Sequence, residues 1–436
     1  MSSKSEDNKI GFIEAASIGI GGMVGGGIFA VLGLAVQLSK GGAPIAFLIA
    51  GIVALVTAYS YSKLSVALPG KGGTVSFLDK AFGSGLFTGS MNILLWISYI
   101  IMLSLYAYAF GSYGAELFSS GSNEFLKHIL ISGIVITITV LNIFSAKLIG
   151  EAEDFIVAIK LLILLFFCVV GFWGIQTDKL TISQWSPATS LVAGGFIIFL
   201  AYEGFELIAN TADDVRTPEK TLPRAFYGSV IFVIALYIIV AAVTVGNLPV
   251  EKIVQAKDYA LAIAAKPFLG QFGIILISIA ALLSTTSAIN ATLYGSARLS
   301  YIIAKDGELP AFLERKVWNK QIEGLLITSA LTLLVANFFN LSSLSTMGSA
   351  GFLLIFAAVN WSNAKLSNET GGSKLLSFTG VGLCLGALAS LLWYAIGNSP
   401  SDILVLLAMI VISLFVESVF RFFVKREIKL SQNAKK

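Results

Sequence analysis

The chain has little of what most enzymes use: its 436 residues include two cysteines and one histidine, and only 12% of the residues are charged. Cys168 and Cys384 both fall in apolar stretches, which indicates buried thiols rather than a disulfide framework or a metal cluster. His128 is expected at the outer end of a helix, which leaves no histidine-based catalytic set. We therefore expect no enzyme, no metal and no cofactor, and the net charge of +4 does not suggest nucleic-acid binding.

Apolar residues are abundant, at 56% of the chain, and the mean hydropathy is +0.86. Several runs are long enough to cross about 30 Å of hydrocarbon, so the sequence predicts an all-α membrane protein with twelve transmembrane helices. These helices are expected near residues 13–37, 43–67, 86–117, 126–146, 154–176, 191–212, 226–247, 270–302, 323–341, 344–362, 376–398 and 402–424.

The basic residues predict the orientation of these spans. Of the 29 lysines and arginines, Lys160 lies within a span and most others fall on the side of the two termini; the exceptions are Lys40, Lys127, Lys179, Lys252, Lys257 and Lys266. Because cytoplasmic loops carry the excess of basic residues, we expect a multi-pass protein of the cytoplasmic membrane, with residues 1–10 and 425–436 as cytoplasmic tails. No cleavable signal peptide is expected, so the first helix remains in the protein.

Two of the predicted spans are interrupted. The first contains GIGGMVGGGIFA (Gly19–Ala30), with five glycines in seven residues, and the sixth contains FLAYEGFE (Phe199–Glu206), with two acids and a glycine. Such interruptions are tolerated inside a membrane only beside protein or a cavity. Matching breaks five spans apart predict an inverted repeat of helices 1–5 (residues 11–176) and 6–10 (residues 191–362), followed by helices 11 and 12 (residues 376–424).

The two breaks together predict a site made of backbone. The half-helix that begins near Gly27 would present amide groups and a positive dipole end to a carboxylate. Unpaired carbonyls of Phe199, Leu200 and Ala201 would accept hydrogen bonds from an ammonium group, so the pair of breaks would bind a zwitterion. The alternative is that the glycines only allow neighbouring helices to pack closely.

Ionisable side chains inside the spans are the other candidates for function. Lys160, in DFIVAIKLLILLFF, is expected to face the interior and to bind and release a proton, because an ammonium group costs at least about 2.5 kcal/mol in hydrocarbon. The alternative is that it snorkels to the interface. Ser284 and Ser287 share a helix face that could contact Lys160, or they could bond locally. Glu206 is a candidate gate or proton relay, and Glu203 could favour cationic substrates.

Two further segments have open interpretations. Residues 248–270 show apolar spacing of three and four, which predicts an amphipathic helix on the outer face; a solvated loop is the alternative. A mixed-charge set near the cytoplasmic ends of helices 5 and 6 could latch an inner gate, or could simply be solvated helix-end charges. The members of this set are Glu151, Glu153, Asp154, Asp213, Asp214, Arg216 and Arg224.

Four stretches resemble the amino acid-polyamine-organocation superfamily, which shares the fold of the leucine transporter LeuT. They are GIGGMVGGGIF at the first break, Tyr59–Gly83, Phe199–Ala225 and Ser284–Pro310, and within the family the chain is most similar to prokaryotic amino acid permeases.

The resemblance implies a substrate site at the two breaks. The substrate carboxylate would meet amides around Gly25, Gly26 and Gly27, and its ammonium would meet carbonyls at Met23, Leu200, Ala201 and Glu203, beside Gly204. Lys160 matches the lysine of proton-coupled members, with Gly21 and Ser284 or Ser287 as its expected partners. Leu200 stands where many relatives carry an aromatic lid, so Phe199, Tyr202 or Phe205 is expected to close the site.

From the residues and the resemblance we expect a secondary active transporter that moves neutral amino acids together with protons by alternating access. Its partners would be an amino acid, protons and the lipid bilayer, and the sequence does not give its oligomeric state. Three alternatives stay open: an exchanger that needs no ion, a transporter of cationic amino acids or polyamines, and a sensor that binds amino acids without moving them.

Overall fold

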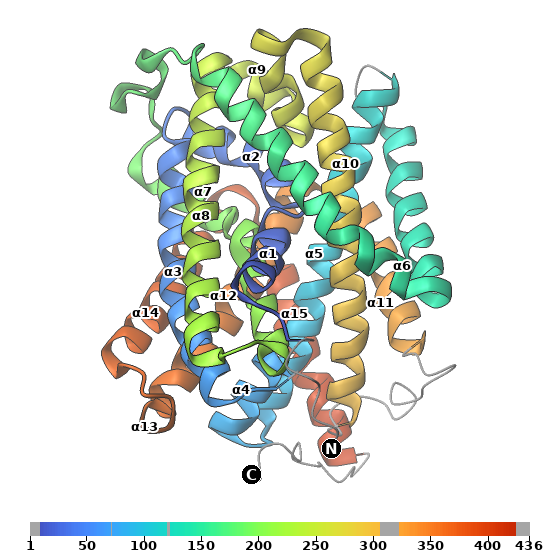
Figure 1. Cartoon of the computed structure of the whole chain (residues 1–436), viewed down its shortest axis with the longest axis vertical. Coiled ribbons are helices and arrows are strands. Elements are labelled where there is room, and N and C mark those ends of the chain that lie inside the picture. Colours follow the sequence, from blue (N-terminus) through green and yellow to red (C-terminus); the bar gives the residue numbers. More distant parts are fainter. Residues whose placement is uncertain (1–8, 71, 120–122, 306–321, 424–436) are drawn as a thin grey trace.

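The computed structural model describes residues 9–70, 72–119, 123–305 and 322–423, with the backbone alone at 145–154 and 423. This part of the chain forms a bundle of helices (Figure 1) and two isolated bridges, Ile10 with Val215 and Lys40 with Trp185. The α-helices are α1 (Phe12–Met23), α2 (Gly27–Ser39), α3 (Ala43–Ala67), α4 (Gly73–Phe82), α5 (Leu86–Ser119), α6 (Glu124–Phe172), α7 (Ala188–Ile197), α8 (Pro218–Asn247), α9 (Val250–Gln255), α10 (Ala260–Lys305), α11 (Ile322–Phe338), α12 (Leu341–Lys365), α13 (Ser367–Thr370), α14 (Lys374–Asn398) and α15 (Pro400–Ser418). Short 3₁₀ segments are η2 (Thr177–Leu180), η3 (Ile182–Gln184) and η5 (Lys257–Tyr259); η4 (Phe199–Asp214) is a long one, and η7 (Val419–Phe423) is a π-helix.

The prediction of an all-α membrane protein is confirmed. Within the described residues, ten helical segments are long and apolar enough to cross a membrane, and the pair α1 and α2, bent by 47°, makes an eleventh when counted as one broken span. The shorter helix α11 has 17 residues. A total of twelve spans therefore stays a prediction.

Two predicted segments can be compared with the structure in detail. The helices expected near residues 126–146 and 154–176 both lie within α6, and each forms a membrane-length segment of its own, Glu124–Phe144 and Phe155–Phe172. The segment 248–270 is helical in pieces, namely α9, η5 and the start of α10, and α10 bends at Gly270, whose φ of 61° suits a residue without a side chain.

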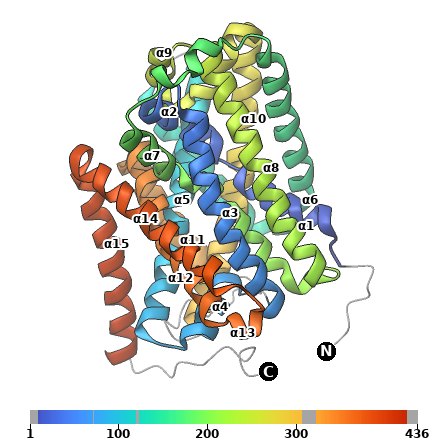
Figure 2. The ribbon, with the colours of Figure 1, turned by 90° about the vertical axis from the view of Figure 1, so that its left-hand side faces the viewer.

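The interrupted segments lie at the centre of the bundle. α3 packs along α8 and α5 along α10, while α1 contacts both α8 and η4. In its most apolar stretch α5 is 89% buried, whereas α14 and α15 are 33% and 22% buried and lie at the rim (Figure 2). We name the two ends of the bundle after α9, which lies at one end, and α4, which lies at the other (Figure 1).

The α9 end is closed over the bundle core. A Cβ on Gly33 of α2 would overlap the backbone of Lys257, so η5 sits directly on α2. The Tyr113 hydroxyl donates to the Phe29 carbonyl at 3.0 Å, and the Tyr108 hydroxyl donates to Asp258 at 3.1 Å while accepting from Lys127 at 3.1 Å. These contacts join α2, α5, α6 and η5 at the α9 end.

Candidate functional site

The two interrupted segments touch backbone to backbone. α1 ends at Met23 and α2 begins at Gly27, while the second interruption is a change of helix type, from the α-helix α7 to the 16-residue 3₁₀ helix η4. A Cβ on Gly22 would lie 2.8 Å from the carbonyl oxygen of Gly204, and a Cβ on Gly204 would overlap the backbone of Gly22 and Met23. This approach requires glycine on both sides. Because 3₁₀ runs of more than four residues are uncommon and often mark hinges, η4 is a candidate moving part.

Hydroxyl groups from two other helices hold the carbonyls of the breaks. The Tyr237 hydroxyl of α8 donates to the Met23 carbonyl at 2.6 Å and lies 3.2 Å from the Ala201 carbonyl. Ser284 of α10 donates to the Val24 carbonyl at 2.7 Å and also contacts the Gly25 carbonyl. Tyr237 thus bonds two of the carbonyls that the sequence assigns to a substrate ammonium group.

Replacing Tyr237 with phenylalanine is expected to destabilise the join between the two breaks. The Met23 and Ala201 carbonyls would lose their donor, and an unsatisfied buried polar group costs about 1–3 kcal/mol. The expected result is a lower melting temperature in detergent and slower amino acid uptake, measured by thermal unfolding and by proteoliposome assay. Tyr394→Phe on the peripheral helix α14 is the matched control, and equal behaviour of the two variants would contradict this role.

Lys160 reaches the first break from α6. Its side chain is 0% exposed, and its Nζ donates to the Gly21 carbonyl at 3.0 Å. A Cβ on Gly21 would lie 3.1 Å from Val157, one turn before Lys160, so α6 packs closely on α1 at this point. The predicted pairing of Lys160 with Gly21 is therefore present, whereas the hydrogen bonds found for Ser284 go to Val24 and Gly25.

A cavity of about 430 Å³ opens beside the breaks. Gly21, Gly22, Glu203 and Gly204 lie in its wall, and the wall continues to Gly72 at the start of α4. Ligand pockets typically measure about 300–1,000 Å³, so the volume suits a small molecule such as an amino acid. Since the α9 end is closed by direct contacts, the cavity leads toward the α4 end.

Glu206 in the cavity wall is a buried carboxyl group surrounded by hydroxyl donors. It is 2% exposed and accepts from the hydroxyls of Tyr61 at 2.9 Å and Thr74 at 3.2 Å, and from the hydroxyl of Tyr99. These donors come from α3, α4 and α5, so one carboxyl group connects three helices to η4. When the carboxyl group is ionised, hydrogen bonds to it are about twice as strong as those to a neutral acceptor.

Glu203, one 3₁₀ turn earlier, has a different environment. It is 0% exposed, and neither carboxyl oxygen has a hydrogen-bond partner within the described residues. Glu203 also belongs to the cavity wall, and both of its carboxyl oxygens are buried in this structure.

The structure divides the predicted site residues into two groups. Five line the cavity: Gly21, Glu203, Gly204, Glu206 and Ser287. The others are buried beside the cavity rather than in its wall: Met23, Gly25, Gly26, Gly27, Lys160, Phe199, Leu200, Ala201, Tyr202 and Ser284.

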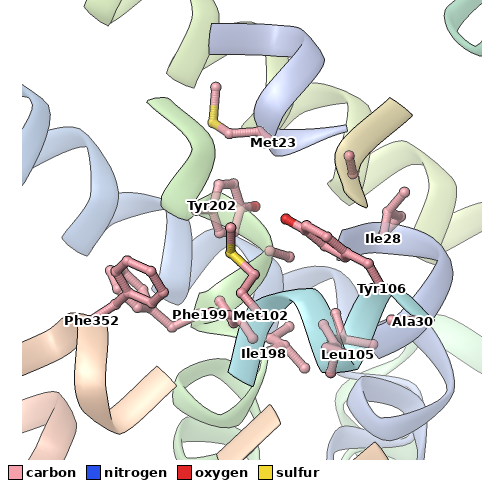
Figure 3. Close-up of a cluster of buried hydrophobic side chains, with 14 of the residues drawn as sticks. Met23, Ile28, Ala30, Met102, Leu105, Tyr106, Ile198, Phe199, Tyr202 and Phe352 are labelled. Atoms are coloured by element: carbon pink, nitrogen blue, oxygen red, sulfur yellow. The ribbon is translucent and has the colours of Figure 1, made fainter. Parts of the chain in front are cut away.

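Tyr106 of α5 covers one of the predicted carboxylate-binding positions. A Cβ on Gly26 would overlap its ring, and Tyr106 lies with Met23, Ile28 and Tyr202 in one buried cluster (Figure 3). The aromatic residues in the cavity wall are Tyr99, Tyr106 and Tyr294. The predicted lid candidates Phe199, Tyr202 and Phe205 are instead packed among other rings.

Sequence reasoning missed the tyrosines that surround the site. Tyr99, Tyr106 and Tyr113 recur at intervals of seven and therefore share one face of α5, which is a signal that the sequence does contain. No comparable pattern marks Tyr237, which is one aromatic residue in an apolar helix.

The mixed-charge set at the α4 end is joined in part by backbone bonds. The Ile10 amide donates to the Asp214 carbonyl at 2.9 Å, the Arg216 amide donates to the Ile10 carbonyl at 2.9 Å, and Arg216 Nε donates to the Lys9 carbonyl at 2.9 Å. These bonds tie the segment before α1 to the end of η4. Asp213 and Arg224 are exposed, and Glu151, Glu153 and Asp154 lie outside the described side chains.

Known proteins resemble this chain in sequence over most of its length. A model of the amino acid permease family matches residues 10–422. The uncharacterized protein MJ0609 of Methanocaldococcus jannaschii is 41% identical over 89% of this chain and 90% of its own. The inner membrane transport protein YbaT of Escherichia coli is 31% identical over 94% of this chain and 96% of its own. The serine/threonine exchanger SteT of Bacillus subtilis is 28% identical over 70% of this chain and 71% of its own.

Proposed function

This chain belongs to the amino acid permease family, and on that premise we propose that it moves neutral amino acids across the cytoplasmic membrane together with protons. It is a multi-pass membrane protein that transports amino acids, and it is not an enzyme. The proposal concerns the driving ion, the class of amino acid and the residues that act.

The observation that carries the proposal is the bond between Lys160 and the first break. Lys160 is fully buried, and its ammonium group donates to the Gly21 carbonyl at 3.0 Å, two residues before the α1 helix ends. Loss of a proton from Lys160 removes a charge from the bundle and weakens this bond. Proton binding and release would thus change the strength of the interaction between α6 and α1, and symport requires such a coupling between protonation and conformation.

The packing supports the proposed inverted repeat of residues 11–176 and 191–362. An exchange of spans 1 with 6, 2 with 7 and 3 with 8 turns the contact of α1 with α8 into that of α7 with α3, and both contacts are extensive. The same exchange maps the pairs α3 with α8 and α5 with α10 onto themselves. Helices α14 and α15 lie outside this symmetric set, in agreement with their proposed place as additions.

We propose that the α4 end faces the cytoplasm, because most basic residues fall on that side. The cavity then represents the cytoplasmic half of an alternating-access path. For a substrate to reach the amides of Gly25, Gly26 and Gly27 from this cavity, the Tyr106 ring must move off Gly26, and the Met23 and Ala201 carbonyls must exchange the Tyr237 hydroxyl for the substrate ammonium group.

Uptake of a radiolabelled amino acid panel into proteoliposomes tests the proposal. With an inward proton gradient, empty vesicles should accumulate neutral amino acids, and a protonophore should abolish the accumulation. Uptake confined to vesicles loaded with amino acid would instead identify an exchanger, the second candidate, to which the name of the relative SteT gives support. Binding without flux under every condition would identify a sensor.

A further inference from the structure

Glu203 and Glu206 lie one 3₁₀ turn apart on η4 and differ in their partners. Three hydroxyl groups donate to Glu206, whereas neither carboxyl oxygen of Glu203 has a partner within the described residues. Both residues are buried and both line the cavity. The cavity wall therefore contains two different carboxyl groups. Hydroxyl groups of the described residues donate to Glu206, and none of them donates to Glu203.

Within the described residues, no cationic side chain donates a hydrogen bond to Glu203. Glu206 on the same element is its main electrostatic neighbour, has the same sign of charge, and lies close enough for the two carboxyl groups to share a proton. Lys160 donates to the Gly21 carbonyl of α1. The other ionisable side chains in the cavity wall are Asp214 from η4, Tyr99 and Tyr106 from α5, and Tyr294 and Arg298 from α10.

A buried carboxylate without a partner is too costly to persist, so it either binds a proton or pairs with a positive charge. Resting on the proposed amino acid transport, we propose that Glu203 is the specificity residue of the cavity and carries one of two partners. With a neutral substrate it holds a proton. With a cationic amino acid, the ammonium or guanidinium group of the substrate side chain displaces that proton and donates to the Glu203 carboxylate.

The proposal makes the binding of cationic and neutral substrates depend differently on pH. Binding of lysine releases the Glu203 proton, whereas binding of norleucine, which lacks the ε-ammonium group, retains it. Protons that bind or leave at Lys160 affect both ligands alike, so the ratio of the two affinities isolates Glu203. By linkage, the preference for lysine over norleucine should rise about tenfold for each pH unit while Glu203 is protonated in the free protein.

The test is competition of L-lysine and L-norleucine against a radiolabelled neutral amino acid for the purified full chain between pH 5.5 and 7.5. In Glu203→Gln the affinity ratio should lose its pH dependence and shift at least tenfold against lysine. Asp213→Asn is the matched control, since Asp213 is an exposed acid of the same element outside the cavity wall, and it should retain the wild-type slope.

A flat ratio in the wild type, or a slope that survives in Glu203→Gln, would overturn the inference. If Glu203→Gln does not fold, the release of one proton for each bound lysine, measured by calorimetry in buffers of different ionisation enthalpy, decides the question with the wild type alone. Transport of neutral amino acids without binding of lysine would sink this inference and leave the proposed function intact, whereas failure to transport any amino acid would sink the proposed function.

Discussion

Replacement of Lys160 with alanine is expected to reduce proton-driven accumulation of amino acids from several-hundredfold to about onefold. One proton that crosses 100 mV supplies roughly 2.3 kcal/mol, and a tenfold proton gradient adds about 1.4 kcal/mol. Together these sustain a concentration ratio of several hundred. Without Lys160 the proposed proton site is gone, and the Gly21 carbonyl loses the donor that lies 3.0 Å away. The measurement is the final internal concentration of labelled substrate in proteoliposomes under an imposed gradient.

Lys160→Arg separates coupling from structure. Arginine keeps a positive charge near Gly21 but does not release its proton at any physiological pH. If Lys160 is the proton carrier, Lys160→Arg should also lose proton-driven accumulation. If Lys160 is only a fixed cation that stabilises α1 and α6, the arginine variant should transport with the wild-type pH dependence.

Lys252→Ala, an exposed lysine of α9 at the opposite end of the bundle, is the matched control and should behave as the wild type. Wild-type pH dependence in Lys160→Ala would contradict the proposed role.

The sequence was sufficient to locate the breaks because both depend on local composition. Five glycines in seven residues cannot continue a membrane helix without compensation, and two acids in an apolar span require a special environment. That Gly21 would be the acceptor for Lys160 was implied only by the family resemblance, but that a buried ammonium group must find an acceptor was accessible from the sequence itself. These inferences need only the residue and the medium that surrounds it.

The sequence did not reveal the hydrogen-bond and packing partners that distant parts of the chain contribute. Tyr237 lies 214 residues after Met23, and its hydroxyl is one of many polar groups that could satisfy that carbonyl. Hydropathy windows measure apolarity rather than helix type, so they did not show that the second break is a 3₁₀ helix. The packing of Tyr106 on Gly26 depends on the rotation of α5, which only the assembled bundle determines.

For Glu203 too, the sequence reveals one part of the answer and only the structure reveals the other. Because a charged side chain inside a membrane span is energetically costly, its position alone marked Glu203 as a candidate for function. The sequence left open whether it would pair with a basic residue. The structure supplies the deciding fact, which is that three hydroxyls converge on Glu206 and none on Glu203.

Replacement of Gly204 with alanine should disrupt the contact between the two breaks more severely than any side-chain truncation nearby. The added Cβ would overlap the backbone of Gly22 and Met23, and it would lie 2.7 Å from the Gly22 Cα. Backbone atoms cannot rotate away as a flexible side chain can, so η4 and α1 must separate. Overpacking of this kind costs typically about 1–3 kcal/mol, and a displacement of about 1 Å in a functional site can cost roughly 100-fold in rate.

The measurements for Gly204→Ala are thermal unfolding in detergent and initial uptake rate, compared with Gly386→Ala. Gly386 lies within α14, and no heavy atom lies within 4 Å of its would-be Cβ, so alanine there should be neutral or slightly stabilising. We expect Gly204→Ala to lower the melting temperature and to reduce uptake by about two orders of magnitude. A folded variant with normal uptake would show that the two breaks can move apart without loss of function, and that their contact in this structure is one state of the cycle rather than the scaffold of the site.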